Sequence, residues 1–175
     1  DHIAGHDAGF AAAEGAQAGL GGRAVALQAH DGHALGVDGA TQLRFALEAS
    51  TVQLAARHAS QEDLGRLSEL NETMRLAIEQ ARYLDAMEAD FGLHMAIAEI
   101  AGNRAIRDIL GLYRPIITRS QRPPVQEPAR LQEAFAEHGA ILRALGRRDG
   151  ETAAVAMRHH IVQSSDRMKV PFIAS

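Results

Sequence analysis

The sequence predicts an all-α fold, an antiparallel bundle of about six to seven helices, from three observations. Hydrophobic residues make up 46% of the 175 residues but aromatic residues only 4%, and tryptophan is absent. A core made of Ala, Leu, Ile, Val and Met suits packed helices better than a sheet. From Thr41 onward the apolar residues recur with the period of a helix, and the periodic segments are joined by short connections.

Residues 1–40 differ from the rest of the chain. They hold nine of the sixteen glycines, and no apolar period persists in them for more than a few residues. This composition predicts a linker or a poorly ordered leader, followed by one helical domain at residues 41–175. Four histidines with glycines nearby, which would make only a weak metal site, are His2, His6, His30 and His33.

The first two helices are predicted from about Thr41 onward, and the last inward residue of the second is Ile78. The first runs from about Thr41 to His58, and Ser60 then has the character of an N-cap, because Asp63 stands three residues later as in a capping box. The inward face of the first helix is predicted to carry Leu43, Leu47, Ser50 and Leu54. The inward face of the second is predicted to carry Leu64, Leu67, Leu70, Met74 and Ile78.

The third and fourth helices are predicted from Asp85 onward. Asp85 can cap or lead a helix that ends near Ala101, and Gly102-Asn103 is a stop followed by a fresh cap. Pro115 is expected to kink or divide the fourth helix. The apolar stripe of the third helix carries Met87, Phe91, His94, Ile97 and Ala98, and that of the fourth carries Ile106, Ile109, Leu110, Tyr113 and Ile117.

The last two helices follow a loop marked by Pro123, Pro124 and Pro128. One runs from about Pro128 to Arg147, and Asp149 caps the other. The inward residues are Leu131, Phe135, His138, Leu142 and Leu145 in the first of them, and Ala153, Met157, His160, Ile161 and Ser164 in the second.

Composition excludes several classes of function. The chain has no cysteine, so any metal must be held by His, Asp, Glu or backbone oxygen. The longest apolar runs fall far short of a membrane span, and no secretory signal is visible, so we expect a cytoplasmic protein with no membrane partner. The net charge of −4 gives no sign of a nucleic-acid-binding surface.

Four polar residues fall on the inward stripes of three helices. Asp90 and His94 are four residues apart, so their side chains point the same way one turn apart. His138 and His160 lie on the inward stripes of the last two helices. His159 lies about 100° around its helix from His160, and we expect it to be exposed.

These four residues have two interpretations. A single histidine on an apolar face is more often a hydrogen-bonded core residue than a ligand, and an Asp within a helix is more often solvated. Ionisable groups are seldom buried without partners, however, and a divalent cation would compensate all four at once. Spacing alone leaves both interpretations open. A central metal or ligand pocket in the bundle is one of them, and its imidazole and carboxylate donors would suit zinc, nickel, iron or manganese.

The chain from Leu43 to Ser175 resembles the FCD domain, the effector-binding domain of the FadR-type GntR transcription regulators. The matching pieces are Leu43–Glu48 with Leu54–Arg57, Asp90–His94 leading to Ala101–Asn103, Glu137-His138 before Ile141–Leu145, and Asp149 leading to Met157–His160. In the metal-binding branch of that family, an Asp and a His one turn apart and two later His 22 residues apart bind the metal. The resemblance therefore implies Asp90, His94, His138 and His160 as ligands.

The resemblance also implies a sensor that works as a homodimer. A small organic acid would place its carboxylate on the metal, and Arg44, which matches the family's first-helix arginine, would pair with that acid. An i, i+4 pair of Arg44 with Glu48 on a solvated face is the alternative. The family binds DNA through an N-terminal winged helix-turn-helix, which residues 1–40 do not match.

We therefore expect a metal-dependent small-carboxylate sensor domain of a GntR-type, DNA-binding transcription regulator, and not an enzyme. The alternative is a metalloenzyme acting on a small organic acid, which would need a general base beside the metal. Glu137 and Glu99 are the nearest by sequence, but both fall off the inward stripes, and this favours sensing. A third possibility is a purely structural metal that clamps three helices.

Overall fold

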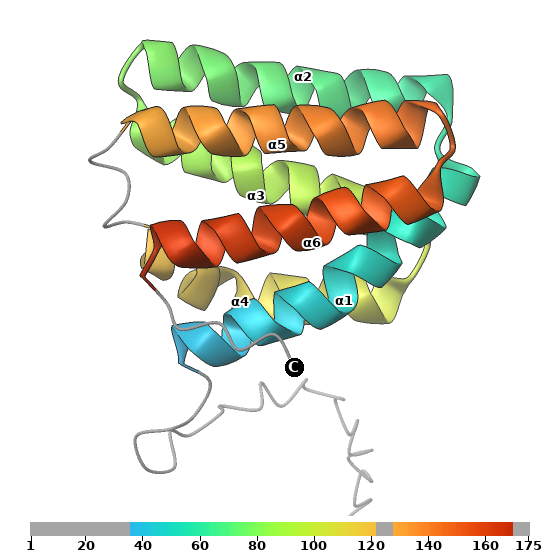
Figure 1. The fold of residues 1–175 in the computed structure, drawn as a ribbon, viewed down its shortest axis with the longest axis horizontal. Coiled ribbons are helices and arrows are strands. Elements are labelled where there is room, and N and C mark those ends of the chain that lie inside the picture. The colour runs from blue at the N-terminus through green and yellow to red at the C-terminus, as the bar shows by residue number, and fades with distance from the viewer. Residues whose placement is uncertain (1–35, 122–127, 170–175) are drawn as a thin grey trace, which may run out of the picture.

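The computed structural model describes residues 36–121 and 128–169, and in these ranges it contains six α-helices and no strand (Figure 1). The expected all-α class is confirmed. The leader histidines and the prolines at 123 and 124 lie outside the described residues. The helices are α1 (Val37–His58), α2 (Gln61–Glu79), α3 (Tyr83–Ile100), α4 (Arg104–Gln121), α5 (Pro128–Gly146) and α6 (Gly150–Arg167).

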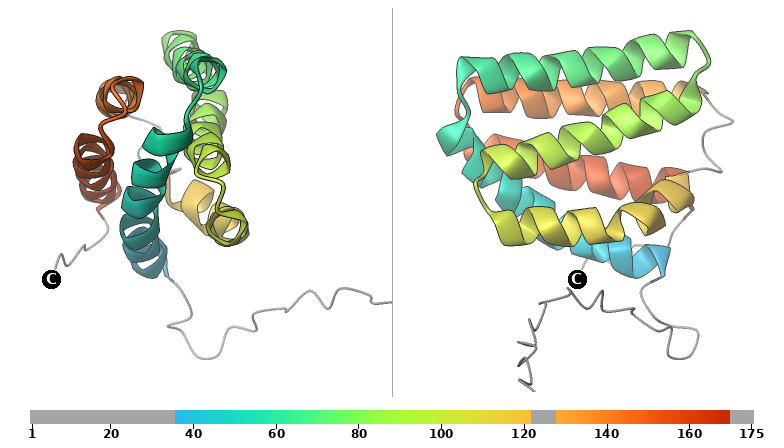
Figure 2. Two further views of the ribbon diagram at one scale, coloured as in Figure 1. Left: turned by 90° about the vertical axis from the view of Figure 1, so that its right-hand side faces the viewer. Right: turned by 180° about the vertical axis from the view of Figure 1, so that it is seen from behind.

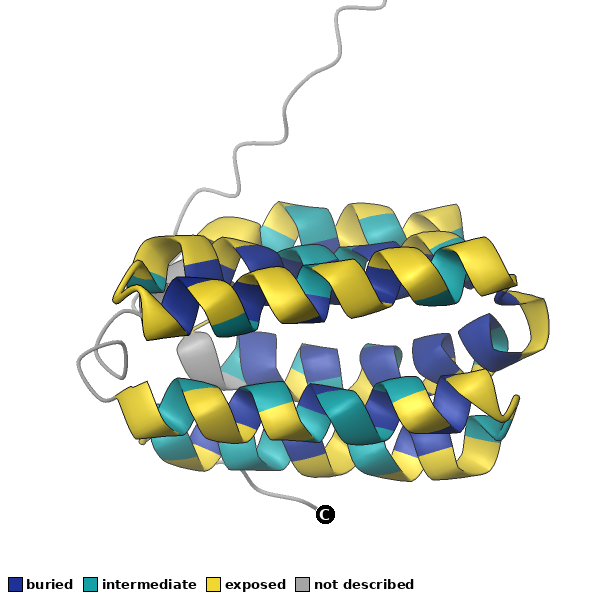
Figure 3. Ribbon diagram, turned by 90° about the horizontal axis from the view of Figure 1, so that it is seen from above, coloured by how far each residue is buried: buried dark blue, intermediate teal, exposed yellow. Residues whose placement is uncertain are grey.

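The six helices form an antiparallel bundle around one interior. α1 packs against α6, α6 against α5, α5 against α2 and α2 against α3, while α4 packs on α3 and α1. The end-on view of Figure 2 shows these helices arranged around the interior, and Figure 3 shows that their buried segments face inward and their exposed segments face out. Because α3 contacts α1, α2 and α4, its side chains are buried on most sides.

Local sequence signals set the ends of the helices. At the start of α2, Asp63 N donates to Ser60 Oγ at 3.1 Å and Ser60 N donates to Asp63 Oδ2 at 2.9 Å, which completes the predicted capping box. Asp149 caps α6 by accepting from a backbone N–H at 2.9 Å, and Asn103 accepts from one at 3.2 Å before α4. Gly102 has a φ of +71°, the left-handed conformation that ends a helix.

Two helix starts and the effect of Pro115 differ from the prediction. α3 begins at Tyr83, and Asp85 lies in its first turn and not at its N-cap. α1 begins at Val37, four residues before the predicted start at Thr41. α4 is not divided, because its helical backbone continues through Pro115 to Gln121. The first turns of α1 lie within the segment that was assigned to the leader on its glycine content.

The predicted inward face of α1 is wrong. Ser50 is exposed, and the three leucines of that stripe are only half-buried. The buried face lies about one residue further round the helix, where Ala49, Ala55 and Ala56 pack closely in the core and the buried polar side chains include Arg44 and Glu48. Small alanines allow close approach of the neighbouring helices, so the leucines form the rim of this contact and not its centre. In α4, Ile109 is likewise exposed, to 37%.

Replacing Ser60 with alanine is expected to cost about 1 kcal/mol in the free energy of unfolding, because the N–H of Asp63 would lose its acceptor. Urea denaturation measures the change. Ser68 is the matched control, since it is an exposed serine within the same helix and its replacement by alanine should leave stability unchanged or slightly raised. Equal losses from both substitutions would contradict a capping role for Ser60.

Candidate metal centre and the adjoining cavity

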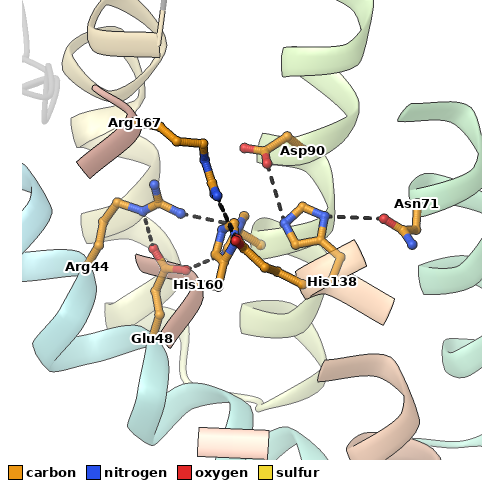
Figure 4. Close-up of polar contacts among 9 residues, drawn as sticks. Arg44, Glu48, Asn71, Asp90, His138, His160 and Arg167 are labelled. Carbon is orange, nitrogen blue, oxygen red and sulfur yellow. Dashed lines mark hydrogen bonds and ion pairs between the residues drawn. The ribbon is translucent and has the colours of Figure 1, made fainter. Parts of the chain in front are cut away.

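Four buried side chains from three helices meet in the interior of the bundle (Figure 4). α3 supplies Asp90 and His94 from adjacent turns of one face, α5 supplies His138 and α6 supplies His160. Each offers one ligand atom, and these atoms all lie within 4.8 Å of one another. We call these four residues the Asp-His cluster.

The three imidazole rings of the Asp-His cluster are in mutual contact. The ring centroids of His138 and His160 are 4.6 Å apart, those of His94 and His160 are 5.0 Å apart and those of His94 and His138 are 5.3 Å apart. By contrast, His159 is exposed, as its position on the helix predicts. The period of α6 therefore directs His160 inward, where it is 1% exposed.

His138 shows most directly that the cluster fits a cation. Its Nδ1 lies 3.3 Å from Asn71 Oδ1, and because a carbonyl oxygen only accepts, Nδ1 carries the proton. The lone pair of Nε2 then lies 3.4 Å from Asp90 Oδ1, and among the described residues this buried nitrogen has no hydrogen-bond partner. Two electron-rich atoms thus face each other, and a cation near both would satisfy them.

His160 is held from outside the cluster by an acid. Its Nδ1 lies 2.8 Å from Glu137 Oε2, and Arg167 grips the same carboxylate with Nη1 at 2.6 Å from Oε1 and Nη2 at 2.7 Å from Oε2. Burial alone would raise the pKa of Glu137, but the hydrogen bonds from Arg167 and His160 lower it. An ionised Glu137 therefore accepts from Nδ1 and leaves Nε2 as the lone-pair nitrogen.

His94 contacts a buried ion pair. Arg44 Nε donates to Glu48 Oε1 at 2.6 Å, and the two side chains are only 5% and 4% exposed. His94 Nδ1 lies 2.5 Å from Glu48 Oε2, although the N–H is not aligned for a hydrogen bond. On the other side of the ring, Arg44 Nη2 lies 3.2 Å from Nε2, which must accept because a guanidinium only donates.

Burial and neighbouring charges shift the pKa values of three members of the Asp-His cluster, His138, His160 and Asp90. Burial is the main cause that lowers the pKa of His138 well below its ordinary value, and it also lowers the pKa of His160. Burial alone would raise the pKa of Asp90, but the surrounding histidines and Arg44 hold it at about 2. Neutral imidazoles beside an ionised carboxylate are the protonation states that bind a metal, and this donor set suits zinc and neighbouring divalent ions.

A small cavity of about 40 Å³ opens beside the cluster, between α3, α5 and α6. Asp90 and His160 form part of its wall, so the cluster is in contact with the cavity. Two arginines, Arg130 and Arg167, also line it, together with apolar side chains such as Met87. Arg130 donates through Nη1 to the backbone oxygen of Arg167 and so ties the start of α5 to the end of α6.

Arg44 lies beside the cluster but is not among the residues that line the cavity. The i, i+4 pair with Glu48 forms, yet on a buried face and not on a solvated one. Sequence reasoning missed the partners that hold the three rings, Glu48, Asn71 and Glu137. Only the seven-residue separation of His160 from Arg167, two turns of one helix, could have pointed to a second residue on that face.

Both the sequence and the fold of this chain match known proteins. The family model described as FCD domain matches residues 40–163. The HTH-type transcriptional repressor NanR of Escherichia coli strain K12 is 30% identical over 133 residues, which is 74% of this chain and 49% of that protein. NanR of Cronobacter sakazakii is 29% identical over 134 residues, covering 74% and 50%. The chain thus spans about half the length of these curated relatives.

Two solved structures share the fold. E. coli McbR/YncC superposes with a TM-score of 0.70 at 20% sequence identity, covering 76% of this chain and 64% of that one. Streptococcus agalactiae GntR superposes with a TM-score of 0.62 at 22% identity, covering 77% and 59%. At such low identities the two structures support the arrangement of helices alone.

Proposed function

The chain belongs to the FCD domain family, and we propose that it is the effector-binding domain of a GntR-type transcription regulator that senses a small carboxylate at a bound divalent metal. The observation that carries this proposal is the Asp-His cluster, four buried ligand residues within 4.8 Å of one another at the wall of a cavity. The similarity to NanR repressors supports a regulatory role.

Asp90, His94, His138 and His160 would hold the metal. Their oxygen and nitrogen donors suit zinc first, and nickel, iron or manganese as well. When bound, the ion supplies a positive charge that attracts a carboxylate oxygen. Asn71 and Glu137 would orient the rings of His138 and His160, and burial of the site would keep water away from the ion.

The cavity lining suits an organic acid. Arg130 brings positive charge to the wall, and guanidinium groups recognise carboxylates with good geometry. Arg167 also lines the wall, but both of its terminal nitrogens bond to Glu137. Met87 and Leu131 provide an apolar surface for a short carbon skeleton. Arg44, which the family resemblance assigns to the acid, is paired with Glu48, so its contribution to acid binding requires that this pair be shared or rearranged.

Sensing follows if the acid binds one arrangement of the bundle more tightly than another, because only a difference in affinity can shift a conformational equilibrium. In the parent protein, a winged helix-turn-helix outside this chain would bind DNA, and two copies would act as a homodimer. Among the described residues, no helix is long and apolar enough to cross a membrane.

Two contacts support sensing over catalysis. A metalloenzyme would need a general base beside the metal. Glu137 is engaged by His160 and Arg167, and Glu99 lies at the surface, where it pairs with Arg66 at 3.0 Å. Both acids that the sequence offers for this role are thus committed to other partners.

Thermal melting of the zinc-loaded chain with a panel of small carboxylic acids tests the proposal. At an acid concentration about 100-fold above its dissociation constant, the midpoint should rise on the order of 5 to 10 °C. The neutral amide of each acid is the control and should give no shift. Turnover of any acid in the same samples would contradict sensing, and stabilisation by zinc without a further shift from any acid would indicate a purely structural metal.

A further inference from the structure

Glu137 is one of two acids outside the cluster whose carboxylates contact its histidines, the other being Glu48. Its side chain projects from α5 next to His138, yet it reaches across to α6 and is only 12% exposed. Its Oε2 accepts from His160 Nδ1 at 2.8 Å. Among the described residues, the carboxylates that face His94 and His138 make no such hydrogen bond, because His94 Nδ1 and His138 Nε2 have no hydrogen-bond partner.

This contact decides which nitrogen of His160 is available. A neutral imidazole has one N–H and one lone pair, so donation from Nδ1 to Glu137 fixes the lone pair on Nε2. The same bond restrains rotation of the ring. Without it, Nε2 could take the proton, and the ring would present no lone pair on that side.

Arg167 holds the Glu137 carboxylate in place. Its two terminal nitrogens bond one each to Oε1 and Oε2, at 2.6 and 2.7 Å, and its side chain is 10% exposed. A two-point contact of this kind fixes the plane of a carboxylate. The chain of contacts therefore runs from Arg167 through Glu137 to His160. Figure 4 labels its two ends, Arg167 and His160.

The three histidines do not share this arrangement. His138 donates to the neutral amide oxygen of Asn71, whereas Glu48, which faces His94, is shared with Arg44 and is not aligned for a hydrogen bond. A carboxylate partner makes an imidazole a more basic ligand than an amide does, and such outer partners affect metal affinity strongly.

We propose that Glu137 is a positioning residue that fixes the tautomer and ring orientation of His160 toward a metal, and that Arg167 holds Glu137 for this task. The inference rests on the proposed metal site and deepens it. The alternative is that Glu137, His160 and Arg167 form only a structural bridge between α5 and α6.

The tautomer of His160 in the metal-free chain of 175 residues distinguishes the two. Long-range ¹⁵N–¹H NMR should show the Nδ1–H form in the wild type and a mixture of both forms in Glu137→Ala. Glu137→Gln should keep most of the Nδ1–H form, because an amide oxygen still accepts from it. A bridge without a positioning role predicts a lower melting temperature and an unchanged tautomer.

Zinc affinity, measured with Zn²⁺ alone by competition with a chelator, is the second readout. Glu137→Ala should weaken binding about 10- to 100-fold, with a smaller loss for Glu137→Gln. Glu133→Gln is the matched control, since Glu133 lies one turn earlier on α5, 3.6 Å from Arg167, but is 62% exposed and should have no effect.

An unchanged tautomer together with zinc affinities within twofold of the wild type would overturn the inference. Failure of the wild-type chain to bind zinc, nickel, iron or manganese would instead overturn the proposed metal site, and the metal-free NMR measurement would still decide whether Glu137 positions His160. The failures of the two proposals are therefore distinguishable.

Discussion

Replacing His138 with alanine is expected to abolish metal binding. His138 is fully buried, and its Nε2 is the nitrogen that lacks a hydrogen-bond partner among the described residues. Changes to outer partners of metal ligands already cost about 10- to 100-fold in affinity, and loss of a ligand should cost more. Metal content after dialysis should fall from one ion per chain to the background level.

His159→Ala is the matched control for this prediction. It removes an imidazole adjacent to His160 in sequence, but His159 is exposed and lies outside the cluster. Its metal content and its response to acids should equal those of the wild type. Far-UV circular dichroism shows whether His138→Ala remains helical. A folded His138→Ala chain that keeps one tightly bound ion would show that the metal lies elsewhere.

Replacing Glu48 with glutamine is expected to lower the free energy of unfolding by about 3–5 kcal/mol. The substitution keeps the shape of the side chain but removes the charge that compensates Arg44, whose guanidinium is 5% exposed. A buried guanidinium cannot lose its proton at ordinary pH, so it would remain charged without its closest partner. Urea denaturation with a fixed m-value measures the loss.

Glu79→Gln is the control for the buried pair. Glu79 also pairs with an arginine four residues away, Arg75, but the two side chains are 53% and 35% exposed. Exposed i, i+4 pairs contribute only about 0.3–0.5 kcal/mol. A loss for Glu48→Gln no larger than this would contradict the buried ion pair. Joint replacement of Arg44 and Glu48 by apolar residues of similar volume should recover much of the stability.

Features that depend on contacts within one helix, such as caps and the inward direction of a side chain, could be predicted from the sequence. The caps at Ser60 and Asp149 depend on contacts between residues three apart, and the structure has both. The inward directions of His94 and His160 depend only on helical period, and both side chains are buried. The cluster itself follows in part, because four polar residues on inward stripes must meet if their helices surround one core.

The face of α1 could not be predicted in the same way. Its leucines and its alanines both recur with helical period, so the sequence allows two stripes. Which of them is buried depends on how closely α6 approaches, and small residues permit the closest approach. Because the alanine stripe of α1 is the buried one, Arg44 and Glu48 are buried with it. The sequence alone could equally place this pair on a solvated face.

The sequence by itself determined the helical class, most helix limits and the inward directions of the four cluster residues, because each depends on neighbours within about one turn. Only the tertiary structure decided which residues surround the cluster. Asn71 reaches His138 across 67 positions of the chain, and Arg167 reaches Glu137 across 30. Such contacts depend on the relative heights and rotations of packed helices, which no local pattern specifies, and they decide which nitrogen of each ring faces the centre.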